Sequence, residues 1–503
     1  MDDNTPLIQS QSHSFSQKRL LVIFPALALI QFTSFLDQTA ILTSLPAIAS
    51  ALDIGASISL VGASFLITST SIQLINGRLS DIFGRKASLI TALSIMATGN
   101  LWSGFSATPV ELFVARAFTG FGAGAINALV QIAIADITTL EQRGYYFGMV
   151  GMAVAFGNGL GPLIGGVLTQ TIGWQWAFWF VCPLCAIAIG YLMSVWPTSR
   201  SISADIRIWD KLKMVDWAGA WASLFSIALL LIPISQCGST MSWASPVAIG
   251  MLIAGVMLFG VFLAIEWRFA NLPLLPAQLF YYNRSTNVLI FVNILIGWVY
   301  WGNLFILPLY LQNVRGSSTA QAGVLMLPMV ITHGLTSGLT GVLISMLGHY
   351  KPIIVTGAFC WTLAALAKIF TVLVGIFAGS DTEDRAVLTG LRNFVRDMGG
   401  ATGTTVSGAI LSNVLSGQLK SRFSNSLTVK LISSAFALKT LHLTCEERDM
   451  IIEAYMKGLH SVFVSFAMLI AIHLCACVRI RDYGLNQGGA QKRQKKINEE
   501  ERI

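Results

Sequence analysis

Two ionisable residues stand inside long apolar stretches of this chain. Asp37 lies within the stretch 20–46 and Arg116 within 109–134. A charge inside a membrane-spanning helix costs roughly 2.5–3.5 kcal/mol on insertion scales, which an opposite charge or a water-filled cavity can offset. We therefore predict that Asp37 takes and releases a proton, with Arg116 adjusting its proton affinity or contacting a substrate. The alternative is a fixed ion pair that holds two helices together.

The composition indicates a membrane protein. Of the 503 residues, 54% are hydrophobic and only 11% are charged, and the mean hydropathy is +0.68. A soluble chain of this length would carry far more charged surface. The net charge of +8 is assigned to Lys and Arg at a cytoplasmic face, so we expect a lipid bilayer as a partner and no nucleic acid.

The apolar residues are grouped into blocks long enough to cross a bilayer. About 20 apolar residues span the hydrocarbon core as a helix, and in lipid a helix satisfies its own backbone hydrogen bonds. We predict an all-α polytopic protein with about thirteen spans. The predicted spans are 20–46, 56–76, 87–106, 109–134, 146–170, 176–196, 216–236, 244–266, 286–311, 322–346, 352–378, 398–416 and 458–478.

The loops between these spans predict the orientation and the domain organisation. Up to residue 351, Arg315 is the only Lys or Arg in a predicted outer loop, so the N-terminus is expected in the cytoplasm. The predicted segments are a cytoplasmic N-tail (1–19), an N-terminal six-helix half (20–196), a basic link (197–214), two extra linker helices (215–266), a C-terminal half (267–478) and a basic C-tail (479–503).

Two sets of residues recur along the chain and predict two parallel halves. Gly77 and Gly84, at the end of the second span, have the same spacing as Gly341 and Gly348 at the end of the tenth. A second set recurs at one constant offset, and such repetition predicts pseudo-symmetric halves. Its members are Glu141, Arg143, Gly148, Gly157, Gly161 and Gly166, matched by Glu383, Arg385, Gly390, Gly399, Gly403 and Gly408.

The repeats also predict that one helix of the C-terminal half is missing. The chain between Gly77 and Glu141 holds two predicted spans, whereas the chain between Gly341 and Glu383 holds one. The difference is about 20 residues, the length of one membrane helix. We place the missing helix near residue 378, and a further span would return the basic C-tail to the cytoplasm.

Two motifs in the N-terminal half predict conformational roles. One is a glycine-flanked cluster of charges that could form an ionic latch between the halves, or could be ordinary cytoplasmic charge. It comprises Gly77, Arg78, Asp81, Gly84, Arg85 and Lys86. The other is a stripe of small residues that allows close helix packing, with a proline that allows a bend. It comprises Gly157, Gly161, Pro162, Gly165 and Gly166.

Candidate residues for a substrate cavity lie on the first, ninth and tenth spans. They are Gln38, Trp298, Tyr300, Trp301 and His333. The aromatic residues either line a site for flat apolar compounds or face lipid. His333 either relays protons or packs as a hydrogen-bonded histidine. No metal cluster, nucleophile triad or phosphate loop is present in the sequence, so we expect no enzymatic activity, metal or cofactor.

The motifs resemble those of the major facilitator superfamily. Residues 77–86 look like its signature loop, Asp37 and Gln38 stand in a stretch like the first-helix motif of its fourteen-helix drug–proton antiporters, and residues 157–166 resemble the fifth-helix antiporter motif. The departures are Gln175, where the family commonly has Arg, and the missing helix. Fungal toxin and drug efflux pumps are the nearest likeness.

The resemblance implies a function. It implies proton-antiport efflux of amphiphilic small organic molecules by alternating access, in a monomeric protein of the plasma membrane or, alternatively, the vacuolar membrane. Two other readings remain. One is an importer or exporter of another solute, such as a siderophore. The other is a degenerate paralogue or sensor that does not transport, as the loss of a cavity helix would permit.

Overall fold

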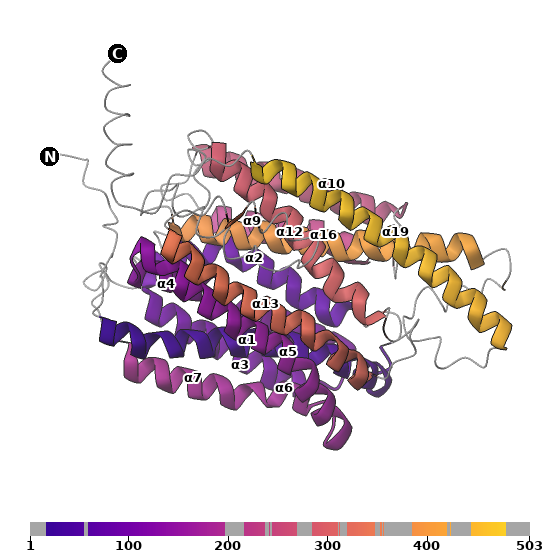
Figure 1. Ribbon diagram of the computed structural model, residues 1–503, viewed down its shortest axis with the longest axis horizontal. Coiled ribbons are helices and arrows are strands. Elements are labelled where there is room, and N and C mark those ends of the chain that lie inside the picture. Colours follow the sequence, from indigo (N-terminus) through magenta and orange to yellow (C-terminus); the bar gives the residue numbers. More distant parts are fainter. Residues whose placement is uncertain are drawn as a thin grey trace, which may run out of the picture.

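The protein is a bundle of long helices. The computed structural model describes residues 17–54, 59–196, 216–236, 244–268, 284–309, 319–347, 385–419 and 444–478, with a few isolated positions between them. Every element in these ranges is an α-helix (Figure 1). They are α1 (Gln17–Ala51), α2 (Ser59–Phe83), α3 (Arg85–Phe105), α4 (Pro109–Ile137), α5 (Leu140–Thr171), α6 (Trp176–Trp179), α7 (Val181–Val195), α9 (Trp217–Gln236), α10 (Pro246–Arg268), α12 (Arg284–Leu309), α13 (Thr319–Leu347), α16 (Arg385–Leu419) and α19 (Cys445–Val478).

The prediction of an all-α polytopic membrane protein is confirmed. Among the described residues, 10 helical segments are long and apolar enough to cross a membrane. The predicted span 352–378 lies almost wholly outside the described residues, as do the link 197–214, the tail 479–503 and the position near 378 where a helix is expected to be missing.

Some helices extend well beyond the predicted spans. α16 begins at Arg385, whereas the predicted span began at 398, and α2 continues through the charged motif to Phe83 instead of ending at 76. Hydropathy excluded these segments because they carry charged residues. Burial against neighbouring helices compensates for those charges, so the helices continue. The motif at 77–86 is therefore the end of a helix and not a loop, with Gly84 as the break between α2 and α3.

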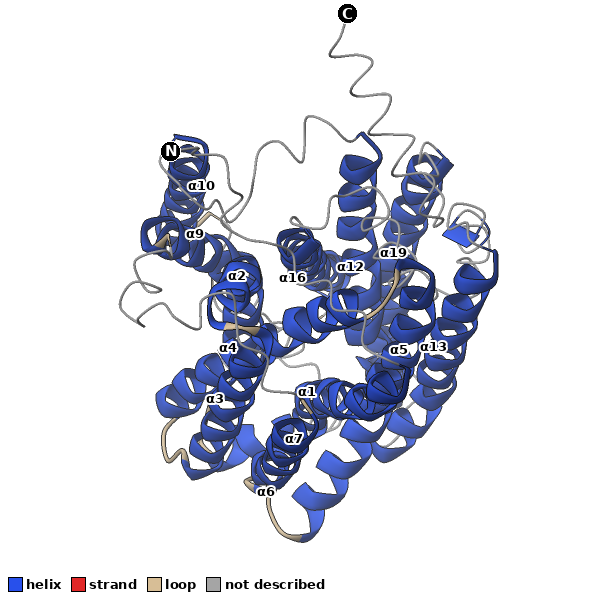
Figure 2. Ribbon diagram, turned by 90° about the vertical axis from the view of Figure 1, so that its left-hand side faces the viewer, coloured by secondary structure: helices blue, strands red, loops and turns tan. Residues whose placement is uncertain are grey.

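The helices form two halves with an additional pair beside them. In the N-terminal half α1 packs against α5 and α7, and α4 packs against α2 and α3; in the C-terminal half α12 packs against α16 and α19. α9 and α10 pack against each other, and α9 contacts α2 and α16 (Figure 2). The halves meet at two contacts, where α5 packs on α13 and where α16 packs on α2. At each contact, a helix of one half lies against a helix of the other half.

Repeated glycines make equivalent backbone contacts in the two halves. A Cβ atom on Gly157 of α5 would lie 2.8 Å from the carbonyl oxygen of Phe32 on α1. Its repeat partner on α16, Gly399, lies in the same way against the carbonyl of Ile294 on α12. One turn further along, Gly161 meets Leu36 and Gly403 meets Trp298. The helix pairs α1–α5 and α12–α16 are therefore structural repeats.

The same symmetry holds at the contact between the halves. Gly148 of α5 lies against the Ser337 carbonyl on α13, and its repeat partner Gly390 of α16 lies against the Gln73 carbonyl on α2. Only small residues permit helices to approach to this distance. The prediction of two pseudo-symmetric halves is thus confirmed at the level of individual backbone contacts.

Adding one methyl group at the α1–α5 contact is expected to destabilise the fold. A Cβ at Gly161 would lie 2.9 Å from both the Ala40 nitrogen and the Leu36 oxygen, so Gly161→Ala should cost about 1–3 kcal/mol. The matched control is Gly190→Ala, where a Cβ meets nothing within 4 Å and helix propensity favours Ala. Thermal unfolding in detergent measures both. Equal melting temperatures for the two variants would contradict the close contact.

Candidate functional site

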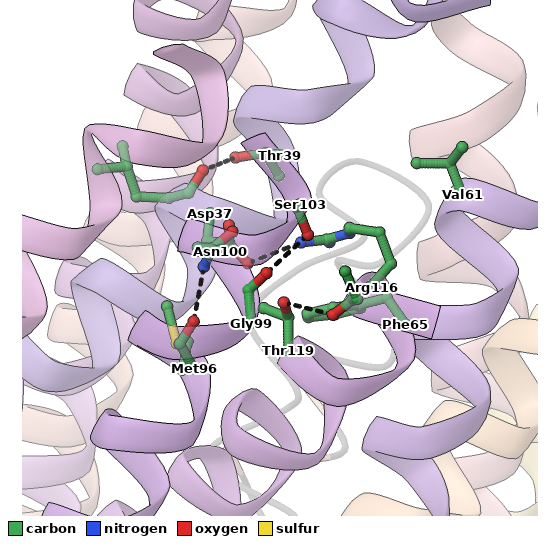
Figure 3. Close-up of polar contacts among 12 residues, drawn as sticks. Asp37, Thr39, Val61, Phe65, Met96, Gly99, Asn100, Ser103, Arg116 and Thr119 are labelled. Carbon is green, nitrogen blue, oxygen red and sulfur yellow. Dashed lines mark hydrogen bonds and ion pairs between the residues drawn. The ribbon is translucent and has the colours of Figure 1, made fainter. Parts of the chain in front are cut away.

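Asp37 and Arg116 come together inside the N-terminal half. Arg116 Nη1 lies 3.5 Å from Asp37 Oδ2, and the two side chains are 2% and 0% exposed. Figure 3 shows Arg116 extending from α4 toward Asp37 on α1. Neither side chain faces the outside of the bundle. The contact agrees with both alternatives derived from the sequence, a proton site adjusted by Arg116 and a fixed ion pair.

The sequence before α4 sets the position of Arg116. Thr108 caps the helix: its hydroxyl accepts the Glu111 N–H at 3.3 Å, and the Glu111 carboxylate accepts the Thr108 N–H at 3.2 Å. Pro109 occupies the first turn, where its missing N–H costs no hydrogen bond. Because this box fixes where α4 begins, Arg116 is placed roughly two turns inside the bundle.

The surroundings of the pair are aromatic and only partly hydrogen-bonded. The guanidinium carbon of Arg116 lies 4.5 Å from the ring centre of Phe65 and 5.7 Å from that of Phe178. Asn100 of α3 lies beside the carboxylate (Figure 3). Asp37 Oδ1, Asn100 Oδ1 and Arg116 Nε have no hydrogen-bond partner among the described residues. The carboxylate therefore keeps one oxygen that can accept a proton.

The predicted small-residue stripe packs α5 onto the part of α1 that carries Asp37. The Thr39 hydroxyl donates to the Gly157 carbonyl at 3.3 Å, and the Thr43 hydroxyl donates to the Pro162 carbonyl at 3.1 Å. The other members also face α1: Gly165 lies against Ala40, and Gly166 more loosely against Thr43 at 3.8 Å. A movement of α5 would therefore act directly on the helix that carries the carboxylate.

The charged motif at the end of α2 forms an ion network. Arg85 Nη2 lies 2.6 Å from Asp81 Oδ1, and Arg85 Nε donates to Asp136 Oδ2 at 2.8 Å. Arg78 lies 3.9 Å from Asp81, and Arg85 also donates to the Ser80 hydroxyl. Asp136, near the end of α4, was missed by the sequence analysis because it lies far from the motif along the chain.

The remaining members of the motif bind the same half of the protein. Gly84 has a φ of 90°, a conformation that glycine adopts without strain, and it lets the chain turn into α3. Lys86 Nζ donates to the Trp196 carbonyl at 2.7 Å, and the Gly77 carbonyl accepts the Ser80 hydroxyl at 2.7 Å. These contacts of the network thus join α2, α3, α4 and the end of α7. Its predicted role as a latch between the halves stays a prediction.

A small cavity lies between the two halves. It is lined by Gln31 and Phe35 of α1, Gln131 of α4, Val150 and Val154 of α5, Tyr300 and Trp301 of α12, His333 of α13, and Arg396 of α16. Its volume is about 20 Å³, enough for a water molecule but not for an organic substrate. The cavity therefore lies where the two halves meet.

Three of the predicted cavity residues line this space. The Tyr300 and His333 rings lie 5.8 Å apart, and the Tyr300 hydroxyl accepts a hydrogen bond from Asn158 Nδ2 at 3.2 Å. Trp301 lines the cavity next to them. The other two do not line it: Gln38 is half-buried on α1, and Trp298 packs against Gly403 of α16.

A polar cluster on α16 was not predicted from the sequence. Arg396 Nε lies 3.2 Å from Asp397 Oδ1, and the two side chains are 8% and 7% exposed. Asp397 Oδ2 accepts a hydrogen bond from Gln73 Nε2 of α2 at 2.8 Å. This bond crosses from one half to the other at the α2–α16 contact.

One turn earlier, a second arginine contacts the opposite half. Arg392 Nη1 donates to Gln131 Oε1 of α4 at 3.0 Å and to Asn393 Oδ1 at 3.1 Å, and Asn393 Nδ2 donates to the same glutamine oxygen at 3.3 Å. The cluster was missed because these charges lie before the predicted span 398–416. Buried apolar neighbours, Leu391, Phe394 and Val395, alternate with them and are the signal that could have shown a membrane helix with one polar face.

Comparison with known proteins identifies the family. The profile of the Major Facilitator Superfamily matches residues 27–380. The chain belongs to this superfamily. Citrate exporter 1 of Yarrowia lipolytica is 33% identical, with 95% of this chain and 74% of that protein aligned. Efflux pump dotC of Dothistroma septosporum is 31% identical, over 66% of this chain and 56% of the pump.

A solved structure shows the same superfamily fold. The crystal structure of the human organic anion transporter MFSD10 (TETRAN) aligns with a TM-score of 0.57 over 91% of this chain and 99% of that one, at 14% identity. At this identity the match supports the fold alone. The resemblance of the motifs to this superfamily is thus confirmed. The substrate, the direction of transport and the coupling to protons are inferred from the site.

The buried ion pair predicts an asymmetric mutational result. Arg116→Gln leaves the Asp37 carboxylate buried without its counter-charge, which should cost about 3–5 kcal/mol. The double variant Asp37→Asn/Arg116→Gln removes both charges and should recover most of that loss. Thermal unfolding of the purified superfamily member measures the cycle. The exposed pair Lys457–Glu453, 2.9 Å apart, is the control and should show coupling of at most about 1 kcal/mol. A double variant as unstable as Arg116→Gln would show that Asp37 is not charged in the fold.

Proposed function

We propose that this protein is a secondary transporter that exports a small organic molecule by alternating access and is driven by protons. The observation that carries the proposal is the buried Asp37–Arg116 pair. Asp37 lies on α1, which also lines the cavity between the halves. The transporter works as a monomer in the plasma membrane. Its cargo enters the cavity when the halves separate on one side and leaves when they separate on the other.

Alternating access is supported by where the halves meet. The cavity is lined from both halves, and its volume of about 20 Å³ holds a water molecule. At the α5–α13 and α2–α16 contacts, glycines of α5 and α16 lie against the backbone of the opposite helix. Close glycine contacts of this kind allow one half to rock against the other while each half keeps its internal packing.

Proton coupling is supported by the asymmetry of the Asp37 carboxylate. Oδ2 faces Arg116 at 3.5 Å, whereas Oδ1 has no partner among the described residues and can take a proton. Protonation would remove the attraction to Arg116 and free the guanidinium. Gln31 and Phe35 stand on the same helix and line the cavity, so α1 provides a direct mechanical path from the proton site to the substrate.

Export as the direction is supported by the relatives that share a third of the sequence. One is named a citrate exporter and another an efflux pump. The first name suggests a carboxylate such as citrate as the cargo, and the motif resemblance suggests amphiphilic organic molecules. Import of another solute and a non-transporting role are the outcomes that a flux measurement must separate from export.

The decisive variant is Asp37→Asn, which keeps the shape of the side chain and removes its proton chemistry. In proteoliposomes with a pH gradient, the wild type should accumulate radiolabelled citrate or rhodamine 6G. The gradient-driven rate of accumulation should be at least tenfold lower for Asp37→Asn. Exchange of labelled for unlabelled cargo without a gradient should survive, because it needs no net proton transfer. Asp53→Asn, at an exposed carboxylate, is the control and should behave as the wild type.

Each failure has a separate meaning. Gradient-driven flux that Asp37→Asn leaves unchanged would exclude coupling through Asp37. Accumulation of the cargo only under a pH gradient of the opposite direction would indicate import. The absence of flux and exchange across a panel of anionic, neutral and cationic organic compounds would contradict transport itself.

A further inference from the structure

The cavity between the halves is lined by buried polar side chains whose hydrogen bonds are incomplete. Gln31 Nε2 donates to Asn127 Oδ1 at 3.1 Å, whereas the amide oxygen of Gln31 has no partner among the described residues. His333 Nε2, from the other half, also has no partner in the described part of the chain. The two side chains are 1% and 3% exposed. Because an unpaired buried polar atom is costly, these atoms indicate a place where a ligand completes the bonds.

Tyr300 adds a hydrogen-bond donor to the same cavity. Its hydroxyl accepts a hydrogen bond from Asn158 Nδ2 at 3.2 Å, which leaves the proton of the hydroxyl to be donated. The Tyr300 ring lies 5.8 Å from the His333 ring, so α12 and α13 bring these two groups side by side. The cavity thus has an acceptor oxygen from α1, a donor from α12, and a histidine nitrogen that donates or accepts according to its tautomer.

Charge does not select the ligand at this place. Arg396 is the one charged side chain among the described residues that line the cavity, and Asp397 neutralises it at 3.2 Å. Selection therefore rests on hydrogen bonding and on size.

A hydroxyl group fits both requirements. The volume of about 20 Å³ holds a group as large as one water molecule. A hydroxyl has this size and both donates and accepts, as the lining requires. An ionised carboxylate only accepts hydrogen bonds and an ammonium group only donates them, so each would leave part of the lining unpaired.

We propose that this cavity is a hydroxyl-binding site: the cargo carries an alcohol or phenol hydroxyl that donates to Gln31 Oε1 and accepts from the Tyr300 hydroxyl. The proposal rests on the proposed transport function and names a chemical group that the cargo carries. His333 Nε2 forms a third hydrogen bond to the same hydroxyl. Trp301 and Phe35, which also line the cavity, cover the carbon atoms next to it.

A hydroxyl bound in this way contacts both halves. Gln31 belongs to α1 of the N-terminal half, whereas Tyr300 and His333 belong to α12 and α13 of the C-terminal half. The three groups converge only while the halves meet at the cavity. A cargo hydroxyl therefore binds this conformation more tightly than one in which the halves are apart, and such a difference in affinity is what shifts a conformational equilibrium.

Two pairs of compounds that differ by one hydroxyl test the proposal on the purified full-length protein in detergent. Citrate is compared with tricarballylate, which lacks only the hydroxyl, and 4-hydroxytamoxifen is compared with tamoxifen. Within the pair that binds, the hydroxyl compound should bind about tenfold more tightly or better, because the other compound leaves the lining unpaired. Equal affinities within each pair would show that the hydroxyl is not recognised.

Two variants locate the recognition at the cavity. Gln31→Met and Tyr300→Phe keep the size of each side chain and remove its polar atoms. Each should weaken binding of the hydroxyl compound about fivefold or more and leave binding of its partner compound unchanged. Gln170→Met, at an exposed glutamine of α5, is the control and should leave both affinities as they are. Equal weakening of both compounds would assign Gln31 and Tyr300 a purely structural role and overturn the proposal.

The binding measurement fails independently of the transport assay. Hydroxyl-dependent binding in a protein without proton-driven flux would leave the site in place and overturn the transport function. Proton-driven flux of rhodamine 6G, which has no hydroxyl, together with no binding of citrate or 4-hydroxytamoxifen would leave the transport function in place and overturn the hydroxyl site.

Discussion

Charged side chains inside this protein exist only because other helices surround them, and that constraint governs the whole structure. An ionised group inside a membrane protein needs a counter-charge or hydrogen bonds, since lipid supplies neither. The structure meets this need in two ways. Asp37 and Arg116 neutralise each other across two helices. Arg392, in contrast, is buried against the amide oxygen of Gln131.

The difference between these two solutions separates two parts of the molecule. The Asp37–Arg116 pair lies in the interior of the N-terminal half, enclosed by Phe65 and Phe178, and is not in contact with the cavity. The α16 arginines lie where the halves meet. A group inside one half can keep its environment while the halves move, whereas a group at their contact changes its partners with every movement.

The glycine contacts make such movement mechanically simple. α5 and α16 are repeats of one another, and each packs by glycine onto the first helix of its own half and onto the second helix of the other half. Close backbone contact at glycines gives van der Waals attraction together with a surface that can tilt. The long helix α1 connects these features, because it carries Asp37, packs against α5, and lines the cavity with Gln31 and Phe35.

The sequence by itself determined the membrane-protein class, the division into two repeated halves and the two charged residues of the first pair, Asp37 and Arg116. Long apolar blocks admit only membrane helices, the recurrence of Gly148, Gly157 and Gly161 at one offset admits only a repeat, and a carboxylate and a guanidinium in separate apolar spans call for a partner or for water. These are local or periodic properties of the chain, so they can be read without knowing which helices touch.

Only the tertiary structure decided where the second polar site lies. Arg392, Arg396 and Asp397 read as polar residues outside a membrane span when hydropathy is judged along the chain. They are buried because α2 and α4, hundreds of residues earlier in the chain, supply Gln73 and Gln131 as partners. The same holds for Asp136, which completes the network of Arg85 from another helix. Burial is a property of what a residue packs against, and packing between distant segments leaves no periodic mark in a single sequence.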